Sequence, residues 1–208
     1  MNNIIENTFT SDDYEMLQRE VLYKGVFTLA RLHIRYKLFD GSWSHTIKRE
    51  ILERLSAAAV LPYDPVRDEI ILIEQFRPGA IFHEHNPWLI EIVAGILDSE
   101  QDSNDVAKRE AEEEAGCVIS DLLPIYEYFI SPGGSNEYLH LYVGKTDTSN
   151  IERINGLAEE DENIRATVMS SEQAFTLLRD GLIKTSPAII SLQWLQLNRT
   201  MLQNLWTA

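Results

Sequence analysis

Basic residues and cysteine are scarce in this 208-residue sequence. Lysine and arginine number 18 against 33 aspartates and glutamates, which gives a formal net charge of −15. An acidic chain without a basic stripe lacks the cations that neutralise phosphates, so we expect no nucleic-acid partner. The single cysteine, Cys117, cannot form an internal disulfide, and this predicts a reducing compartment, the cytoplasm.

Long apolar segments are also missing. The longest uninterrupted apolar run, Ala57–Leu61, is far shorter than the roughly 20 residues that a helix needs to cross a bilayer, so we expect no membrane partner. No lysine or arginine precedes Arg19 and no apolar segment follows the start, so no signal peptide is expected. With 44% hydrophobic residues and 9% aromatics, the composition is that of a globular protein with a real core.

The N-terminal quarter has the pattern of a small antiparallel unit. Residues 32–38 alternate apolar and basic side chains, the period of a half-buried strand. Asp40-Gly41 indicates a hairpin turn, after which residues 43–47 resume the alternation. Because such a unit buries too little apolar surface to be stable alone, we expect residues 1–55 to pack on residues 56–208 or on a second subunit.

Beyond residue 55 the pattern predicts strands interleaved with helices, which is typical of an α/β sandwich with a mixed sheet. The expected strands span residues 57–61, 69–76, 88–93, 123–130, 138–143 and 165–170. Helices are expected over residues 103–115, from 170 to 181 and from 186 to about 205, because serine or aspartate at each start is a good N-cap. Glycine ends the first two helices.

Two acidic clusters carry most of the net charge. Residues 95–118 have a net charge of −6, and residues 159–162 are four consecutive acids. On the predicted helix, Glu110, Glu113 and Glu114 fall within an arc of about 100°. The helix dipole disfavours acids in the last turn by roughly 0.3–1 kcal/mol each, and like charges four residues apart repel. A divalent cation, Mg²⁺ or Mn²⁺, would offset this repulsion, and a solvated acidic surface is the alternative.

The segment from Gly95 to Cys117 resembles the Nudix box, G-x5-E-x7-R-E-U-x-E-E-x-G-U, where U is aliphatic. Six of its seven fixed positions match with the right spacing: Gly95, Arg109, Glu110, Glu113, Glu114 and Gly116. The seventh position holds Gln101 in place of glutamate. A pattern with this many fixed positions is specific, so the chain is identified by resemblance as a member of the Nudix hydrolase family.

A marker residue narrows the resemblance to the ADP-ribose pyrophosphatase subgroup. Pro132 lies 16 residues beyond Gly116, at the position of that subgroup's proline. The resemblance implies a Nudix α/β/α sandwich over residues 56–208. It also implies that residues 1–55 form an antiparallel unit used for adenine recognition and for a domain-swapped homodimer.

The resemblance implies hydrolysis of the diphosphate of ADP-ribose to AMP and ribose 5-phosphate, by water activated on Mg²⁺ or Mn²⁺. It assigns the metal to the carbonyl of Ala94 and to the carboxylates of Glu110, Glu113, Glu114 and Glu162. Glu160 would be the general base, and Arg109 would brace the loop of the box against the helix through an ion pair. The implied substrate-binding residues are Val26, Phe27, Arg49, Glu50, Arg54, Arg77, Ser131 and Glu137.

Two departures from the family pattern leave alternatives open. Val26 stands where the family stacks an aromatic side chain on adenine, which keeps other nucleoside diphosphate sugars, such as GDP-mannose, as substrates. Gln101 stands where a family glutamate pairs with Arg109, and this is the support for a non-catalytic Nudix-like nucleotide sensor. Glutamine can still bond a guanidinium without the ion-pair component, so we expect a slower or less stable enzyme.

Overall fold

The computed structural model describes residues 9–83, 86–98, 101–157 and 162–207. The chain divides into two compact units. The first contains the residues up to Arg54 together with Phe129–Glu137, and the second contains Leu55–Tyr128 and the residues from Tyr138 onward. The chain therefore enters the first unit twice, and the segment 129–137 lies beyond the division near residue 55 that the sequence suggests.

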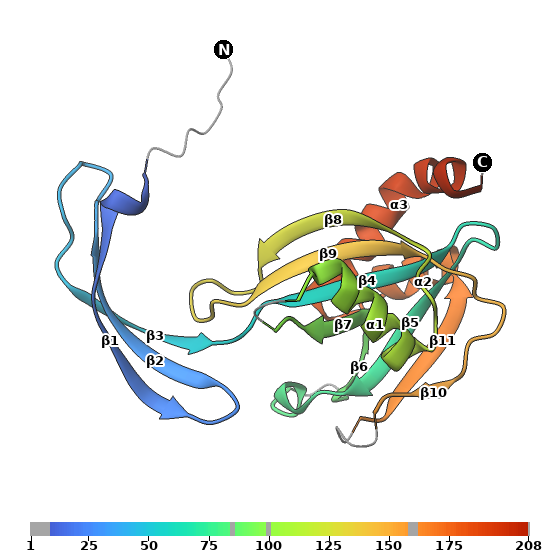
Figure 1. Ribbon diagram of the computed structural model, residues 1–208, viewed down its shortest axis with the longest axis horizontal. Helices are drawn as coiled ribbons and strands as arrows, with labels where there is room; N and C mark the ends of the chain where they lie inside the picture. Colours follow the sequence, from blue (N-terminus) through green and yellow to red (C-terminus); the bar gives the residue numbers. More distant parts are fainter. Residues whose placement is uncertain (1–8, 84–85, 99–100, 158–161, 208) are drawn as a thin grey trace, which may run out of the picture. The chain divides into compact units, whose positions relative to one another are not determined.

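The first unit is a three-stranded antiparallel sheet (Figure 1). A short 3₁₀ turn, η1 (Ser11–Asp13), precedes its strands, which follow the chain order: β1 (Tyr14–Lys24), β2 (Thr28–Tyr36) and β3 (Ile47–Glu53). The expected strand over residues 32–38 overlaps β2, the expected strand over residues 43–47 reaches β3 only at Ile47, and β1 is not predicted. Irregularities in the β1–β2 register break the alternation of β1, and most of its side chains are exposed.

The second unit is built on a mixed sheet with the strand order β10-β11-β5-β4-β9-β8. These strands are β4 (Ala57–Asp64), β5 (Glu69–Phe76), β8 (Asp121–Phe129), β9 (Tyr138–Lys145), β10 (Ile154–Asn155) and β11 (Ile164–Ser170). Strands β4 and β9 are parallel, whereas β5 pairs antiparallel with β4 and β11. Every residue of β4 is buried, as expected for a strand covered on both faces.

The predicted strand over residues 88–93 is two strands instead. β4 and β5 pair only next to their turn, at Tyr63 with Ile70 and Asp64 with Glu69, and then separate. β6 (Trp88–Glu91) pairs with β5, and β7 (Val93–Ile96) pairs with β4. The chain changes its partner strand between them, so the interruption follows from pairing that a local pattern does not contain.

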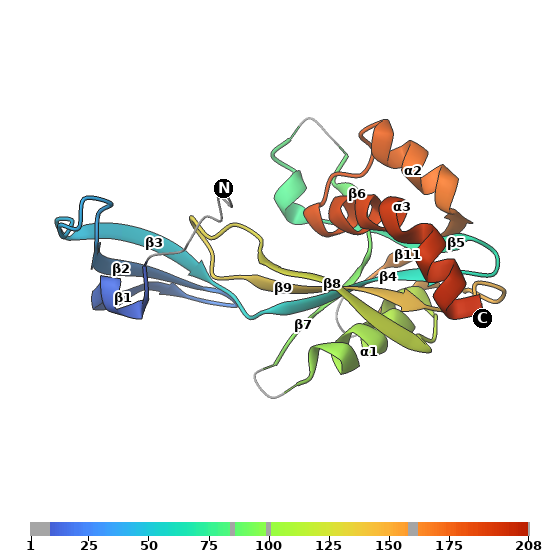
Figure 2. The same cartoon turned by 90° about the horizontal axis from the view of Figure 1, so that it is seen from above.

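Helices cover both faces of this sheet (Figure 2). α1 (Ser103–Ala115) lies on one face, and α2 (Ser171–Arg179) and α3 (Ser186–Thr207) lie on the other. The Asp102 side chain caps α1 by accepting from the Asn104 N–H, and Gly116, with φ of 60°, ends it. The α/β/α sandwich and the start of all three helices are confirmed. In the described residues, none of the helices is long and apolar enough to span a membrane.

Candidate active site

The last turns of α1 face strand β7. Glu110 projects over Gly95, and a Cβ at residue 95 would overlap the carboxylate end of Glu110. Glycine at this position therefore lets the helix carboxylate lie directly on the strand backbone. This close contact between Glu110 and the backbone of Gly95 explains why the acidic motif begins with a glycine, fifteen residues before Glu110.

Glu114 is the most buried acid of α1, with only 3% of its surface exposed. Its Oε2 accepts a hydrogen bond of 3.0 Å from the Ala94 N–H on β7. Burial, together with the charges of Glu110 and Glu162, raises the pKa of Glu114 to about 8, although the hydrogen bond from the Ala94 N–H and the charge of Arg77 lower it. A buried carboxylate beside two others is unfavourable unless a cation or proton joins it.

Arg109 forms its ion pairs within α1. Its Nη2 lies 2.7 Å from Glu110 Oε1, and its Nε lies 3.9 Å from Glu113 Oε2. In the described residues, Arg109 therefore does not form the expected ion pair between the loop of the box and the helix. Gln101 Oε1 instead accepts a 3.4 Å hydrogen bond from the Asp98 N–H, so Gln101 and Arg109 have separate partners.

Of the second acidic cluster the structure describes Glu162, and the segment that precedes the cluster contacts the end of α1. The Gly156 N–H donates to the Glu113 carbonyl over 3.0 Å, which holds the segment after β10 against the helix. The Glu162 N–H donates to the Leu157 carbonyl over 3.2 Å. The charge of Glu162 acts on both Glu110 and Glu114. Glu160, the predicted base, lies outside the described residues.

The donor set suits a hard divalent cation. Carboxylates from α1 and from the loop after β10 converge with the β7 backbone, and oxygen donors of this kind bind Mg²⁺ or Mn²⁺. Within the described ranges, however, no three acidic, histidine or cysteine side chains already stand at ligating distances of one point. The carboxylates are held by Arg109 and the Ala94 N–H, so ligation would require them to turn from these donors.

Arg77 stands at the end of β5, where its N–H donates to the Pro87 carbonyl over 2.9 Å. Its side chain is paired with Glu91 of β6, and its charge lowers the pKa of Glu114. Glu91 is not suggested by any motif in the sequence. Only the structure identifies Glu91 as a site residue, because strand pairing places this acid opposite Ile73 at the edge of the core.

The other predicted substrate residues belong to the first unit. There, Arg54 Nη1 lies 2.9 Å from Glu137 Oε2, and the Arg54 guanidinium lies 4.9 Å from the centre of the Phe27 ring. These three side chains form one aromatic and charged cluster. Val26, beside it in sequence, is 96% exposed and offers no ring for stacking.

Three further predicted residues have local partners in the same unit. Arg49 donates to the Lys48 carbonyl, Glu50 pairs with Arg31, and the Ser131 carbonyl accepts from the Gly134 and Ser135 N–H groups. The structure therefore gathers Phe27, Arg54 and Glu137, and gives Arg49 and Glu50 other contacts.

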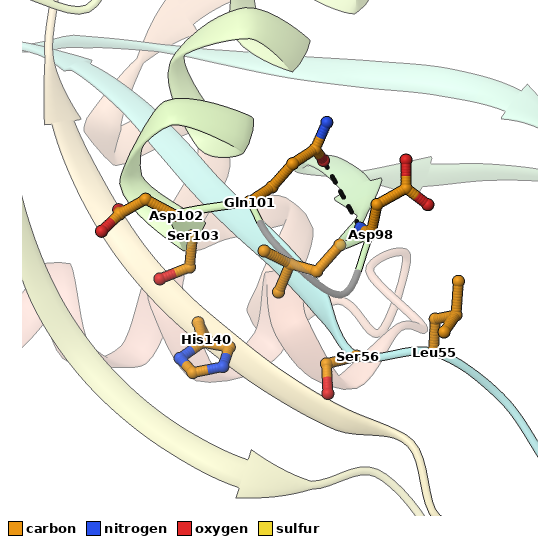
Figure 3. A pocket seen from close by; sticks show the side chains of 8 residues that line it. Leu55, Ser56, Asp98, Gln101, Asp102, Ser103 and His140 are labelled. Carbon is orange, nitrogen blue, oxygen red and sulfur yellow. Dashed lines mark hydrogen bonds between the residues drawn. The ribbon is translucent and has the colours of Figure 1, made fainter.

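A cavity of about 430 Å³ lies at the N-terminal end of α1, and Figure 3 shows the side chains that line it. Asp98, Gln101, Asp102 and Ser103 line it from the start of the helix, and His140 lines it from β9. Glu110 lies seven residues beyond Ser103, about 10 Å along the helix axis, and no glutamate is among the residues that line the cavity. The cavity is therefore distinct from the carboxylate cluster, although both use the same helix.

A profile of the NUDIX domain matches residues 53–191, which include the whole carboxylate cluster. The chain belongs to the NUDIX domain family. The acidic helix and the glycine that begins its motif are thus the Nudix box of this protein. The prediction of the family from the spacing of these residues is confirmed.

Curated relatives match this NUDIX protein over nearly its full length. It is 45% identical over 199 residues to the ADP-ribose pyrophosphatase of Escherichia coli strain K12, covering 96% of this chain and 95% of the relative. It is 43% identical over 201 residues to that of Haemophilus influenzae, covering 95% and 93%. The GDP-mannose pyrophosphatase of Klebsiella pneumoniae is 31% identical over 191 residues, covering 91% and 94%.

A solved structure described as an ADP compounds hydrolase resembles this NUDIX protein with a TM-score of 0.64. The likeness covers 88% of this chain and 95% of that chain, at 19% sequence identity. At this identity the likeness supports the fold, and it agrees with the sandwich and the N-terminal sheet described above.

Proposed function

We propose that this NUDIX protein is an ADP-ribose diphosphatase that hydrolyses the substrate to AMP and ribose 5-phosphate. The observation that carries the proposal is 45% identity over 96% of the chain to a curated ADP-ribose pyrophosphatase. The converging carboxylates of α1 and the loop after β10 supply the chemistry that a diphosphate hydrolase needs. A chain of charge −15 would repel the anionic diphosphate without a cation.

Glu110, Glu113, Glu114 and Glu162 would hold a divalent cation together with the Ala94 carbonyl. Bound there, the ion would polarise a phosphoryl oxygen and lower the pKa of a water. Glu110 lies close to the β7 backbone because residue 95 is glycine, and this closeness brings a carboxylate to the Ala94 peptide. The burial of Glu114 disfavours an uncompensated charge, which supports cation binding at this position.

The remaining chemistry falls to other side chains. Glu160 is proposed as the base that accepts the proton of the attacking water, on the strength of its place in the acidic loop. Arg77 is proposed to bind a phosphate oxygen. Arg109 is proposed to hold the Glu110 carboxylate, with which it is paired, in place next to β7.

The first unit is proposed to bind the organic ends of the substrate in a domain-swapped homodimer. Its cluster of Phe27, Arg54 and Glu137 offers an aromatic face, a guanidinium and a carboxylate for a nucleoside or a ribose. Arg49 and Glu50 are proposed to join it from the partner subunit, and Ser131 to bond the terminal ribose. The cytoplasm is the proposed compartment, because Cys117 is free and buried.

The test is release of AMP from ADP-ribose by the purified protein with Mg²⁺ or Mn²⁺, followed by chromatography. We expect turnover with ADP-ribose and none in excess chelator. Tight binding of ADP-ribose in excess chelator would contradict the role given to the cation. Absence of AMP release, together with cleavage of another nucleoside diphosphate sugar, would overturn the substrate assignment.

GDP-mannose is the second candidate substrate. The exposed Val26 in place of a stacking ring and the 31% identical GDP-mannose pyrophosphatase favour including it. Cleavage of GDP-mannose with a higher kcat/KM than ADP-ribose would make this the principal activity. Binding of ADP-ribose or GDP-mannose without turnover of either would favour the alternative that this protein is a non-catalytic nucleotide sensor.

A further inference from the structure

Glu91 is a buried carboxylate that the proposed reaction does not yet use. It ends β6, and only 8% of its surface is exposed. It pairs with Ile73, a residue of the core cluster beneath α1, and paired residues of antiparallel strands lie on one face of the sheet. Glu91 therefore belongs to the face that carries the Nudix box helix.

The partner of Glu91 is the Arg77 guanidinium. Arg77 Nε donates to Glu91 Oε2 over 2.9 Å, and Nη2 lies 2.9 Å from the same oxygen. The two side chains differ in exposure, at 44% for Arg77 and 11% for Glu91. Since the carboxylate is buried and the guanidinium is half-exposed, Glu91 is the fixed member and Arg77 is the member it orients.

This contact leaves one edge of the guanidinium for a ligand. Within the described residues, Arg77 Nη1 has no acceptor. Glu91 lies on the sheet face that carries α1, and its ion pair brings Arg77 to the same side of the sheet as the carboxylate cluster. A guanidinium held at Nε and Nη2 presents its remaining donors in a fixed plane, the geometry that suits a phosphate.

A second buried polar side chain, Gln75, lies on the same face of the sheet as Glu91. Gln75 of β5 is 8% exposed; its Nε2 forms no hydrogen bond of good geometry among the described residues, but its side chain acts on the Glu91 carboxylate and lowers the pKa of Glu91. Its paired residue on β6 is Leu89, two positions from Glu91, so Gln75 and Glu91 are diagonal neighbours. A buried amide donor beside a buried carboxylate favours the charged form of that carboxylate, which supports Glu91 as a fixed partner of Arg77.

We propose that Glu91 is a positioning residue that orients Arg77 toward the diphosphate of the substrate. The inference rests on the proposed function and deepens it, because it adds a residue that acts on the substrate through another side chain. Glu91 keeps the cationic edge of Arg77 in place before the substrate arrives. The entropic cost of ordering the long Arg77 side chain then does not reduce the affinity for the substrate.

A double-mutant cycle tests this role. Glu91→Gln keeps the shape and removes the charge, Arg77→Ala removes the oriented group, and the third variant combines both. We expect Glu91→Gln to lower kcat/KM for ADP-ribose by about tenfold, and to have no further effect in the Arg77→Ala background. An equal loss in both backgrounds, or no loss in either, would overturn the proposal.

A conservative variant and a matched control accompany the cycle. Arg77→Lys keeps the charge without the planar fork, so its loss should match that of Glu91→Gln. Glu74→Gln removes the partner of Arg165 from the residue next to Gln75, and should leave kcat/KM unchanged. Thermal unfolding of each variant shows whether a loss of activity reflects a loss of folded protein.

Binding of a methylene-bridged, non-hydrolysable ADP-ribose analogue separates this inference from the proposed function. Wild-type protein that binds the analogue but releases no AMP would contradict the proposed function alone. The inference would then stand if Glu91→Gln weakened that binding about tenfold and Arg77→Ala abolished the effect of Glu91→Gln. Wild-type protein that neither binds the analogue nor hydrolyses ADP-ribose would overturn both.

Discussion

Replacement of Gly95 by alanine should separate the position of Glu110 from the stability of the fold. The added methyl group would overlap the Cγ, Cδ and Oε1 atoms of Glu110, so this side chain has to swing away from β7. The backbone of Gly95 has no positive φ, so alanine is not strained there. The contact that must yield is the end of a flexible side chain, which is why the displacement is feasible.

Gly95→Ala should change the stability little, because its two effects on stability oppose each other, and should lower turnover strongly. A displaced rotamer of Glu110 costs about 0.5–1.5 kcal/mol, and replacing glycine by alanine in an unstrained conformation restores about 0.4–1 kcal/mol. The free energy of unfolding should therefore change by less than about 1 kcal/mol. A carboxylate moved by about 1 Å from its working position lowers turnover by about 10²-fold.

The assay pairs AMP release from ADP-ribose with thermal unfolding, across a series of Mg²⁺ concentrations. Gly79→Ala is the matched control, because its Cβ would meet no atom within 4 Å. We expect Gly95→Ala to lose turnover and to need more Mg²⁺, while Gly79→Ala resembles the wild type. Wild-type turnover and Mg²⁺ dependence in Gly95→Ala would refute the placement of Glu110 at the cation.

Three further outcomes are expected. Glu114→Gln should lower kcat at least 10²-fold without loss of the folded state, measured beside Glu112→Gln on the exposed side of α1, and near-full activity would exclude Glu114 as a ligand. Burial would raise the pKa of Asp64, but hydrogen bonds from Arg67 and Thr148 outweigh it and lower the pKa to about 2. Because the unfolded pKa is about 3.9, about 2.5 kcal/mol of stability is present above pH 4 and lost as the pH falls to 2; acid unfolding of Asp64→Asn should lack this loss. Arg54→Ala should raise KM for ADP-ribose more than it lowers kcat, since it removes a contact to the organic part of the substrate, and an unchanged KM would contradict that contact.

Local signals in the sequence predict the helices well. The capping aspartate before α1 and the glycine after it are contacts within one turn, and their residue types alone indicate the ends of the helix. Ser170 caps α2 in the same way. The acids of the Nudix box are found from spacing for the same reason, since neighbouring turns of one helix bring them together.

Features that depend on pairing between distant segments could not be predicted in this way. β1 was not predicted because its register with β2 is irregular. The division of residues 88–93 into two strands was not predicted because these residues pair first with β5 and then with β4. Glu91 acquires its place through its register with β5. The partners of Arg109 also differ from expectation, because side-chain choice among nearby acids is decided by three-dimensional packing.

The exchange of partner strands at Ile92 limits how this protein can evolve. Glu91 and Val93, on either side of it, are paired with residues of the same core cluster, and Gly95 follows two positions later. One inserted or deleted residue between β6 and β7 would turn one strand's side chains to the opposite face of the sheet. Among descendants of this chain, length changes should therefore be absent between residues 91 and 95, and Ile92, which is buried, should remain apolar.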